Sequence, residues 1–137
     1  METYPVQVHV RVRSADVGPD GAVDPRSVLV YLQEARRAYI GVLNVGETRL
    51  REVRVDLEVL QEVEPGDELA VRVRIVELAR SSFSMDYLVR DRLTREPVAR
   101  ARTQLMLVDE DRVPAPLPEA FRGRVQALEG RTFPLPA

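Results

Sequence analysis

The chain of 137 residues is 45% hydrophobic and 31% charged, a size and composition typical of one globular domain spanning 1–137, and its net charge of −2 offers no attraction for nucleic acid or an anionic membrane. It contains no cysteine, and its 20 basic residues are all arginine, which excludes disulfides, thiolate metal sites, cysteine nucleophiles and lysine chemistry. Because no apolar run approaches the roughly 20 residues of a membrane-spanning helix and the N-terminus has no apolar signal core, we expect a cytoplasmic protein without membrane insertion or a nucleic-acid partner.

The first predicted elements are a strand and a long helix. Valine alternates with polar residues over residues 6–12, the pattern of a strand with one buried face; the valines are Val6, Val8, Val10 and Val12. Asp24 and Pro25 indicate a helix start, because an aspartate can cap free amides and proline loses nothing at the first helical position. Apolar residues then recur every three or four positions as far as Leu43, which predicts a helix over residues 25–43 that is covered on most sides.

Four more strands and a short helix are predicted after it. Apolar residues alternate with charged or polar ones near residues 53–59, 69–75, 83–89 and 99–107. The connections are short, which implies antiparallel neighbours. A proline-rich run ends the sheet, and residues 118–137 are expected to form a short helix, about Glu119 to Leu128, and a tail. One long helix packed on a five-stranded antiparallel sheet is an α+β fold of two layers.

This order of elements and the loop before the helix resemble the hot-dog fold, and in detail the 4-hydroxybenzoyl-CoA thioesterase (acyl-CoA thioesterase) family. The family stretch D-x-D-x-x-G-H-V-N-N-x-x-Y-x-x-Y-x-E-E-A-R aligns without gaps from residue 16; its matches are Asp16, Gly21, Val23, Tyr31, Glu34, Ala35 and Arg36. The segments VLQEVEPGDELAVRVRIVEL, VARARTQLMLVD and PAPLPEAFRGRV are also similar. The resemblance implies a single hot-dog domain, a thioester of CoA or of an acyl carrier protein as ligand, and a homodimer or homotetramer.

The chain departs from the family pattern at the positions that carry the chemistry. The family's catalytic carboxylate is the second aspartate of D-x-D, and here that position is Gly18. The family's histidine is replaced by Ala22, and its two asparagines by Asp24 and Pro25. In family members a main-chain N–H at the helix start polarises the thioester carbonyl, and in some of them it falls at the position of Pro25, which has no N–H. The resemblance therefore implies slow or impaired hydrolysis.

Three carboxylates in this loop are candidate catalytic groups. Asp16 stands at a family position, although its side chain can also bind the loop's own amides. Asp20 can instead be an ordinary turn residue, and the simplest alternative role for Asp24 is the helix N-cap. If the protein hydrolyses thioesters, we expect a water held by Asp16 to attack, with Gly21 and the amide of Arg26 supplying the oxyanion contact.

The resemblance also indicates where a substrate would be bound. Arg80, Ser81 and Ser82 match the region where family members hold the CoA phosphates, and arginine suits that bidentate task, although a solvated turn explains the same residues equally well. Tyr31 belongs to the matched helix and is expected to contact substrate. No cofactor is implied, and no metal site is expected, because ligands of the right type and spacing are missing.

Three functional hypotheses remain open at this point. The leading one is an acyl-CoA thioesterase-like protein that hydrolyses or binds an acyl thioester, with the acyl chain beside the apolar helix. The second is a catalytically impaired hot-dog module that binds acyl thioesters or a protein partner, as Gly18 and Pro25 favour. The third is a structural oligomer without a small-molecule site. A long exposed edge strand invites aggregation, which favours a dimer independently of the resemblance.

Overall fold

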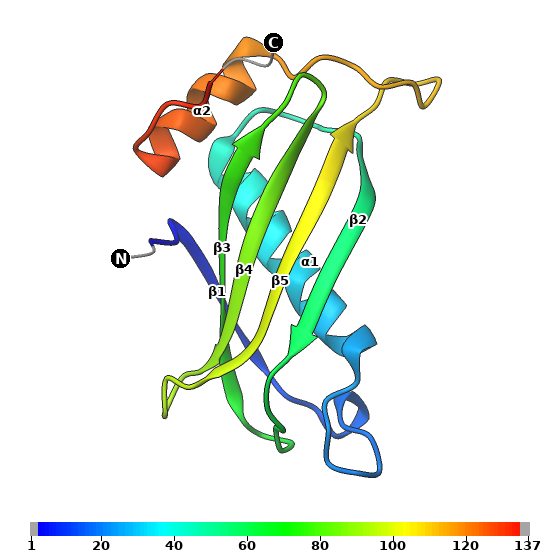
Figure 1. Cartoon of the computed structure of the whole chain (residues 1–137), viewed down its shortest axis with the longest axis vertical. Coiled ribbons are helices and arrows are strands. Elements are labelled where there is room, and N and C mark those ends of the chain that lie inside the picture. The colour runs from blue at the N-terminus through cyan, green and yellow to red at the C-terminus, as the bar shows by residue number, and fades with distance from the viewer. Residues whose placement is uncertain (1–2, 135–137) are drawn as a thin grey trace.

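The computed structural model describes residues 3–134, which contain five strands and two α-helices (Figure 1). The strands are β1 (Val6–Arg11), β2 (Leu50–Val59), β3 (Glu68–Leu78), β4 (Ser82–Asp91) and β5 (Pro97–Leu107). The helices are α1 (Pro25–Leu43) and α2 (Glu119–Glu129), and a short 3-10 helix, η1 (Ser14–Asp16), follows β1. The two ends of the predicted domain, residues 1–2 and 135–137 of the tail, lie outside the described residues.

The strands form one antiparallel sheet in the order β1-β3-β4-β5-β2, which confirms the predicted five-stranded sheet. The register places apolar residues opposite one another, as in the pairs Val8 with Val71 and Tyr87 with Ala101. Because side chains alternate between the two faces of a strand, this register gathers the apolar ones on a single face. The strands at the two edges are β1 and β2.

Helix α1 begins and ends where its sequence indicates. The Asp24 side chain accepts a hydrogen bond from the Arg26 amide, Pro25 occupies the first turn, and Asn44 ends the helix in the left-handed conformation with a φ of 52°. One face is buried along the whole length of the helix; its residues are Val28, Tyr31, Leu32, Ala35, Tyr39 and Leu43. Burying one such large side chain stabilises the fold by about 1.5–3 kcal/mol.

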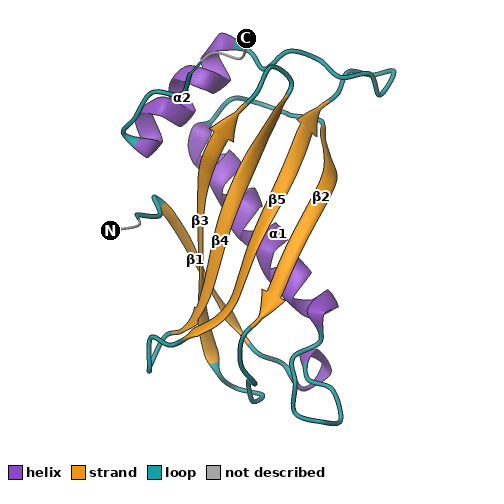
Figure 2. Ribbon diagram, in the orientation of Figure 1, coloured by secondary structure: helices purple, strands orange, loops and turns teal. Residues whose placement is uncertain are grey.

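The sheet and α1 form two layers, with α2 at one end of the molecule (Figure 2). The buried face of α1 packs most closely on β1 and β3. The sheet contributes a buried apolar face opposite it, which includes Val71, Val73, Phe83, Met85, Tyr87 and Val89. This is the predicted hot-dog arrangement of one long helix packed on a five-stranded antiparallel sheet. None of the described helices is long and apolar enough to cross a membrane.

Two strands differ from the prediction in detail. Val12 lies one residue beyond β1, although it is buried and its amide donates to the Asp67 carbonyl at 2.9 Å. The three valines of β2 are not covered: Val53, Val55 and Val59 are 42%, 36% and 36% exposed, whereas Leu50 and Leu57 are partly buried against the core. The reason is the position of β2 at the sheet edge away from β1 and β3, on which α1 packs most closely.

Candidate functional site

The loop between β1 and α1 is a small hairpin closed by a tight turn. The Gly18 amide donates to the Ala22 carbonyl at 2.8 Å, and the Gly21 amide donates to the Gly18 carbonyl at 3.1 Å. Residues 18–21 are therefore a four-residue turn, with proline at its second position and glycine at its fourth, as type I turns prefer. Gly21 has a φ of 83°, where a side chain would be strained. The hairpin holds the loop in one shape ahead of the helix.

Asp16, the carboxylate at a family position, is buried and fully engaged. It is 1% exposed, and its Oδ2 accepts hydrogen bonds from the Tyr31 hydroxyl at 2.6 Å and from the Arg13 amide at 3.0 Å. Its Oδ1 accepts from Arg13 Nη2 at 3.1 Å. Its carbonyl accepts from the Asp24 amide at 2.7 Å, so Asp16 joins β1, the loop and α1.

These contacts determine the charge state of Asp16. Burial alone raises the pKa of a carboxyl, but hydrogen bonds from Tyr31, Arg13 and Ser27 outweigh it and lower the pKa of Asp16 to about 2. Burial and the bond to Asp16 raise the pKa of Tyr31. A carboxylate with so low a pKa, shielded from water, is a weak general base. The side chains of Asp16 and Tyr31 are thus both buried, and neither is accessible to a substrate.

Asp24 caps the helix and binds the neighbouring arginine. Its Oδ1 accepts from the Arg26 amide at 2.9 Å, and both of its oxygens accept from the Arg26 guanidinium. Hydrogen bonds from the Arg26 side chain and amide lower the pKa of Asp24. The amides of Ser27 and Val28 also donate, both to the Asp24 carbonyl. The Arg26 amide, predicted to contact the oxyanion, is therefore occupied, and a substrate would have to displace Asp24 to reach it.

Asp20 differs from the other two loop carboxylates. It is exposed, and its Oδ1 accepts one hydrogen bond, from the Ala22 amide at 3.1 Å. That oxygen lies 3.2 Å from the point where a Cβ on Gly18 would stand. Asp20 and the position of the missing family carboxylate are thus neighbours across the turn. Gly21, the other predicted contact at this turn, lies next to Asp20 and is half-buried, and its amide already donates to the Gly18 carbonyl.

The structure adds residues that the sequence did not single out. Arg13 and Ser27 both bind Asp16. The spacing of Arg13 three residues before Asp16 was a usable signal, since such a pair can cap a turn. Glu62 comes from the loop between β2 and β3, and its Oε2 lies 3.8 Å from the point where a Cβ on Gly21 would stand. No local pattern predicts that approach, because Glu62 is 41 positions further along the chain.

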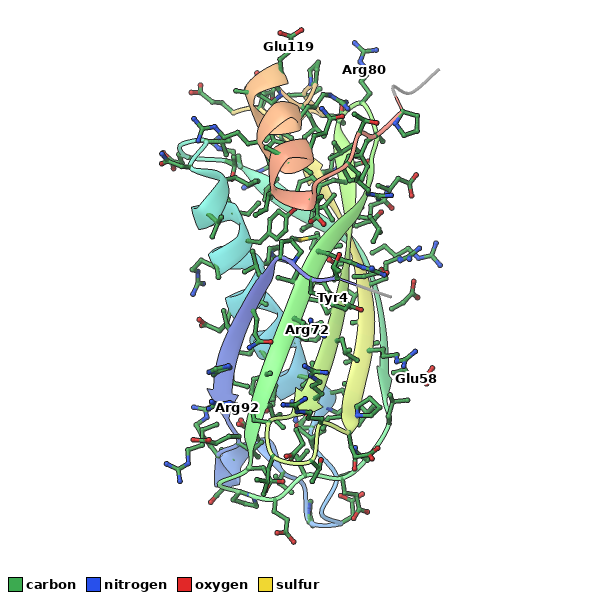
Figure 3. All side chains as sticks on the ribbon, turned by 90° about the vertical axis from the view of Figure 1, so that its left-hand side faces the viewer. Tyr4, Glu58, Arg72, Arg80, Arg92 and Glu119 are labelled. Carbon is green, nitrogen blue, oxygen red and sulfur yellow. The ribbon has the colours of Figure 1, made fainter. Side chains whose placement is uncertain are left out.

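The predicted phosphate-binding residues lie at the other end of the molecule. Arg80 and Ser81 lie in the turn between β3 and β4, Ser82 is the first residue of β4, and Figure 3 shows Arg80 at the end that carries α2. The hairpin loop lies at the start of β3, because the Gly66 amide donates to the Val12 carbonyl at 2.8 Å. The 11 residues of β3 separate the two ends by about 35 Å. Within one chain, the structure does not bring the two groups of predicted residues together.

Two cavities accompany the Arg80 turn. One, of about 400 Å³, is lined mainly by apolar side chains between the start of β2, the end of β5 and α2; they include Val45, Leu50, Leu107, Leu117 and Phe121. The other, of about 320 Å³, is polar and lies on the sheet beside β2, where its lining includes Ser82, Arg102 and Gln104. Ser82 is buried and its hydroxyl faces the Gln104 amide at 3.5 Å. Arg80 is exposed, so its guanidinium is available to an anion.

Comparison with solved structures identifies close structural relatives. A thioesterase from Thermus thermophilus, in complex with coenzyme A and zinc, is 38% identical, with a TM-score of 0.88 over 97% of this chain and 100% of that one. A 1,4-dihydroxy-2-naphthoyl-CoA thioesterase from Synechocystis is 22% identical, with a TM-score of 0.77 over 90% of this chain and 97% of the other. Within residues 3–134, no three histidine, aspartate or glutamate side chains of this chain gather closely enough to hold a metal ion.

A third similar structure, that of a protein from Pseudomonas aeruginosa, has a TM-score of 0.80 at 19% identity over 90% of this chain and 99% of that one. The two relatives below 25% identity bear on the fold alone. No curated protein matches the sequence. The family model of the thioesterase-like superfamily matches residues 12–125. This range includes the hairpin loop, α1, strands β2 to β5 and most of α2. The chain therefore belongs to the thioesterase-like superfamily, with the hot-dog fold.

Proposed function

We propose that this protein is an acyl-CoA thioesterase whose site is completed by two copies of the chain. The observation that carries the proposal is the placement of the two predicted half-sites at opposite ends of the molecule. The hairpin loop and the helix start occupy one end, and the Arg80 turn with its apolar cavity occupies the other. The two groups lie about 35 Å apart within one chain. A single CoA thioester can therefore contact both only if a second chain supplies one of them.

Strand β2 offers the means of joining two copies. Its first residue, Leu50, pairs with Leu107, whose amide donates to the Ser81 carbonyl at 2.8 Å, so this end of β2 lies at the Arg80 turn. The last residue of β2, Val59, lies toward the hairpin-loop end of the sheet. Two β2 strands paired antiparallel across a two-fold axis would place the hairpin loop of one copy beside the Arg80 turn of the other.

The chemistry of each half supports a CoA thioester. The exposed Arg80 can hold a phosphate with charge-assisted hydrogen bonds, and the cavity of about 400 Å³ can take an apolar group. The relative of 38% identity binds coenzyme A, which supports CoA over an acyl carrier protein as the carrier. The reaction is hydrolysis of the thioester to a carboxylic acid and free CoA.

A second function is favoured by the helix start. Pro25 has no amide hydrogen, and the amides of Arg26, Ser27 and Val28 are all engaged by Asp24. A thioester carbonyl therefore meets no free donor in the first turn of α1. A module that binds acyl thioesters without hydrolysing them would have the same features.

A thiol-release assay distinguishes the two functions. The chain has no cysteine, so a thiol reagent added to protein and acyl-CoA reports only the CoA released. We expect turnover with at least one member of a panel of aliphatic and aromatic acyl-CoAs. We expect slower turnover when the same acyl group is carried on an acyl carrier protein instead of CoA. Binding by calorimetry without turnover would instead establish the binding module.

An arginine variant tests the placement of CoA. Arg80→Ala should raise KM by about 10-fold or more, because a hydrogen bond to a charged group contributes about 1.5–3 kcal/mol. Arg92→Ala is the matched control, since Arg92 is also a surface arginine but lies toward the other end of the molecule and pairs with Glu68 at 3.2 Å. An unchanged KM in Arg80→Ala would remove Arg80 from the site.

A further inference from the structure

We infer that Asp20 supplies the carboxylate that Gly18 lacks, as the general base of the proposed thioesterase reaction. The inference rests on the proposed function and on one distance. A Cβ built on Gly18 would stand 3.2 Å from Asp20 Oδ1, closer than an ordinary van der Waals contact. Asp20 therefore fills space that an aspartate at position 18 would need. The carboxylate stands two residues further along the chain, and the turn brings its Oδ1 beside position 18.

The other two aspartates of the loop are already engaged. Asp16 is 1% exposed and both of its oxygens accept hydrogen bonds from Arg13 or Tyr31. Both oxygens of Asp24 accept from Arg26. The exposed Asp20 accepts a single hydrogen bond, at Oδ1, from the Ala22 amide. Its Oδ2 is left to accept a proton from water.

The turn fixes the position of this carboxylate. The bond from the Ala22 amide to Oδ1 holds the side chain against the turn, and the bond between Gly21 and Gly18 closes the turn itself. A general base has to stand within hydrogen-bond reach of the water that it activates, so such a fixed position favours catalysis. Oδ1 thus fixes the carboxylate in place through its hydrogen bond, and Oδ2 is available to accept the proton.

The proposed reaction proceeds in two steps. Asp20 Oδ2 takes a proton from a water molecule while the water oxygen forms a bond to the thioester carbonyl carbon, and the carbonyl π electrons move to its oxygen. The oxyanion then re-forms the double bond, the C–S bond breaks, and the CoA sulfur leaves with the bond's electron pair. The proton held by Asp20 passes to that sulfur, so the products are a carboxylic acid and CoA thiol, and the carboxylate is regenerated.

Glu62 is the rival carboxylate at this loop. Its Oε2 lies 3.8 Å from a Cβ position on Gly21, so it borders the same turn from another loop. Of the two carboxylates, only Asp20 lies within 4 Å of a Cβ position on Gly18. The structure therefore favours Asp20, and the experiment includes both residues.

The test compares kcat and KM in the thiol-release assay for a set of variants. Asp20→Asn should lower kcat by at least about 100-fold, the lower end of what a general base contributes, with KM changed by less than about threefold. Glu62→Gln should keep kcat within about threefold. Asp91→Asn is the matched control, because Asp91 Oδ1 accepts from the amide two residues later, at 2.8 Å, just as Asp20 does.

Moving the carboxylate back gives a second, independent readout. The double variant Gly18→Asp with Asp20→Gly should recover at least about a tenth of the wild-type kcat, because the carboxylate returns to the same space. Gly18→Asp alone should be less active than the double variant, since its Cβ would stand 3.2 Å from the Asp20 oxygen. Circular dichroism confirms that each variant is folded, so a loss of kcat reports on the carboxylate.

Each result has one reading. Full activity in Asp20→Asn, or a large loss in Glu62→Gln alone, overturns the assignment while leaving the thioesterase function standing. A wild-type protein that binds acyl-CoA but does not release thiol overturns both the assignment and the hydrolytic function. A large loss of kcat in Asp20→Asn, together with recovery of kcat in the double variant, establishes Asp20 as the base.

Discussion

A buried carboxylate organises the loop at the scale of single residues. The Asp16 carboxylate accepts hydrogen bonds from the side chain and amide of Arg13 and from the hydroxyl of Tyr31. Its backbone carbonyl accepts one from the Asp24 amide. It thus connects β1, the hairpin and α1. A catalytic role for Asp16 remains a prediction, and its contacts support a positioning role, in which it sets where the hairpin stands relative to α1.

Replacing Asp16 should therefore destabilise the fold. Because hydrogen bonds lower the pKa of Asp16 from 3.8 to about 2, its ionised form contributes about 2 kcal/mol to the free energy of unfolding at neutral pH. We expect Asp16→Asn to lose roughly that amount at pH 7 in urea denaturation. Glu34→Gln is the control, because the Glu34 carboxylate pairs with Arg37 at the surface and should contribute less than about 0.5 kcal/mol.

The contribution of ionised Asp16 also makes the free energy of unfolding depend on pH. A folded pKa lower than the unfolded one means that the stabilisation is complete above pH 3.8 and is lost as the pH falls toward 2. The difference in unfolding free energy between wild type and Asp16→Asn should therefore shrink between these values. A difference that stays constant from pH 5 to pH 2 would show that Asp16 is not held ionised by its partners.

At the scale of elements, the end of α2 takes the place of a missing strand. Strand β1 pairs with β3 only as far as Val73, so the residues of β3 beyond it have no strand on that side. The Glu129 carboxylate accepts the Ile75 amide at 2.9 Å and the Tyr39 hydroxyl, and Arg131 Nη2 donates to the Val76 carbonyl at 2.7 Å. Burial and the bond to Glu129 raise the pKa of Tyr39. Helix α2 is thus tied to both layers.

A change at Glu129 should loosen this end of the molecule. Glu129→Ala leaves the Ile75 amide and the Tyr39 hydroxyl without their acceptor, and each unsatisfied buried group costs about 1–3 kcal/mol. We expect a lower unfolding free energy and faster hydrogen exchange at the Ile75 amide. Glu129→Gln keeps an acceptor oxygen and should lose less, while Glu119→Gln, at the exposed start of α2, should change neither measurement.

The elements were predictable from sequence because their signals are local. The alternation of valines in residues 6–12 and the pair Asp24-Pro25 each depend on neighbouring residues. The starts of β1 and α1 therefore fall where predicted, and β1 ends one residue before Val12. The burial of Asp16 depends on Tyr31, which is 15 positions away, and the approach of Glu62 depends on another loop. These parts of the site require the tertiary structure. The local polarity of residues 14–20 indicates only a solvated loop.

At the scale of the whole molecule, the edge of the sheet formed by β2 defines how two copies would join. β2 is a strand of 10 residues at that edge, and it exposes three valines. A long edge strand with exposed apolar residues readily pairs with another chain. The same strand runs from the Arg80 turn toward the hairpin loop, so pairing and completion of the site would be one event.

The last prediction follows from this coupling. Sedimentation equilibrium at micromolar concentration should give twice the chain mass of 15.5 kDa. The variant Val55→Asp with Val59→Asp places four carboxylates at a two-fold interface and should shift the protein to a monomer, because like charges repel across paired strands. Since each site needs both chains, the monomer should lose thiol-release activity even though the loop and the Arg80 turn are intact in each chain. Leu93→Ser is the control, as Leu93 is 91% exposed at the turn after β4, away from the edge. A wild type of 15.5 kDa, or a monomeric variant with full activity, would show that one chain suffices.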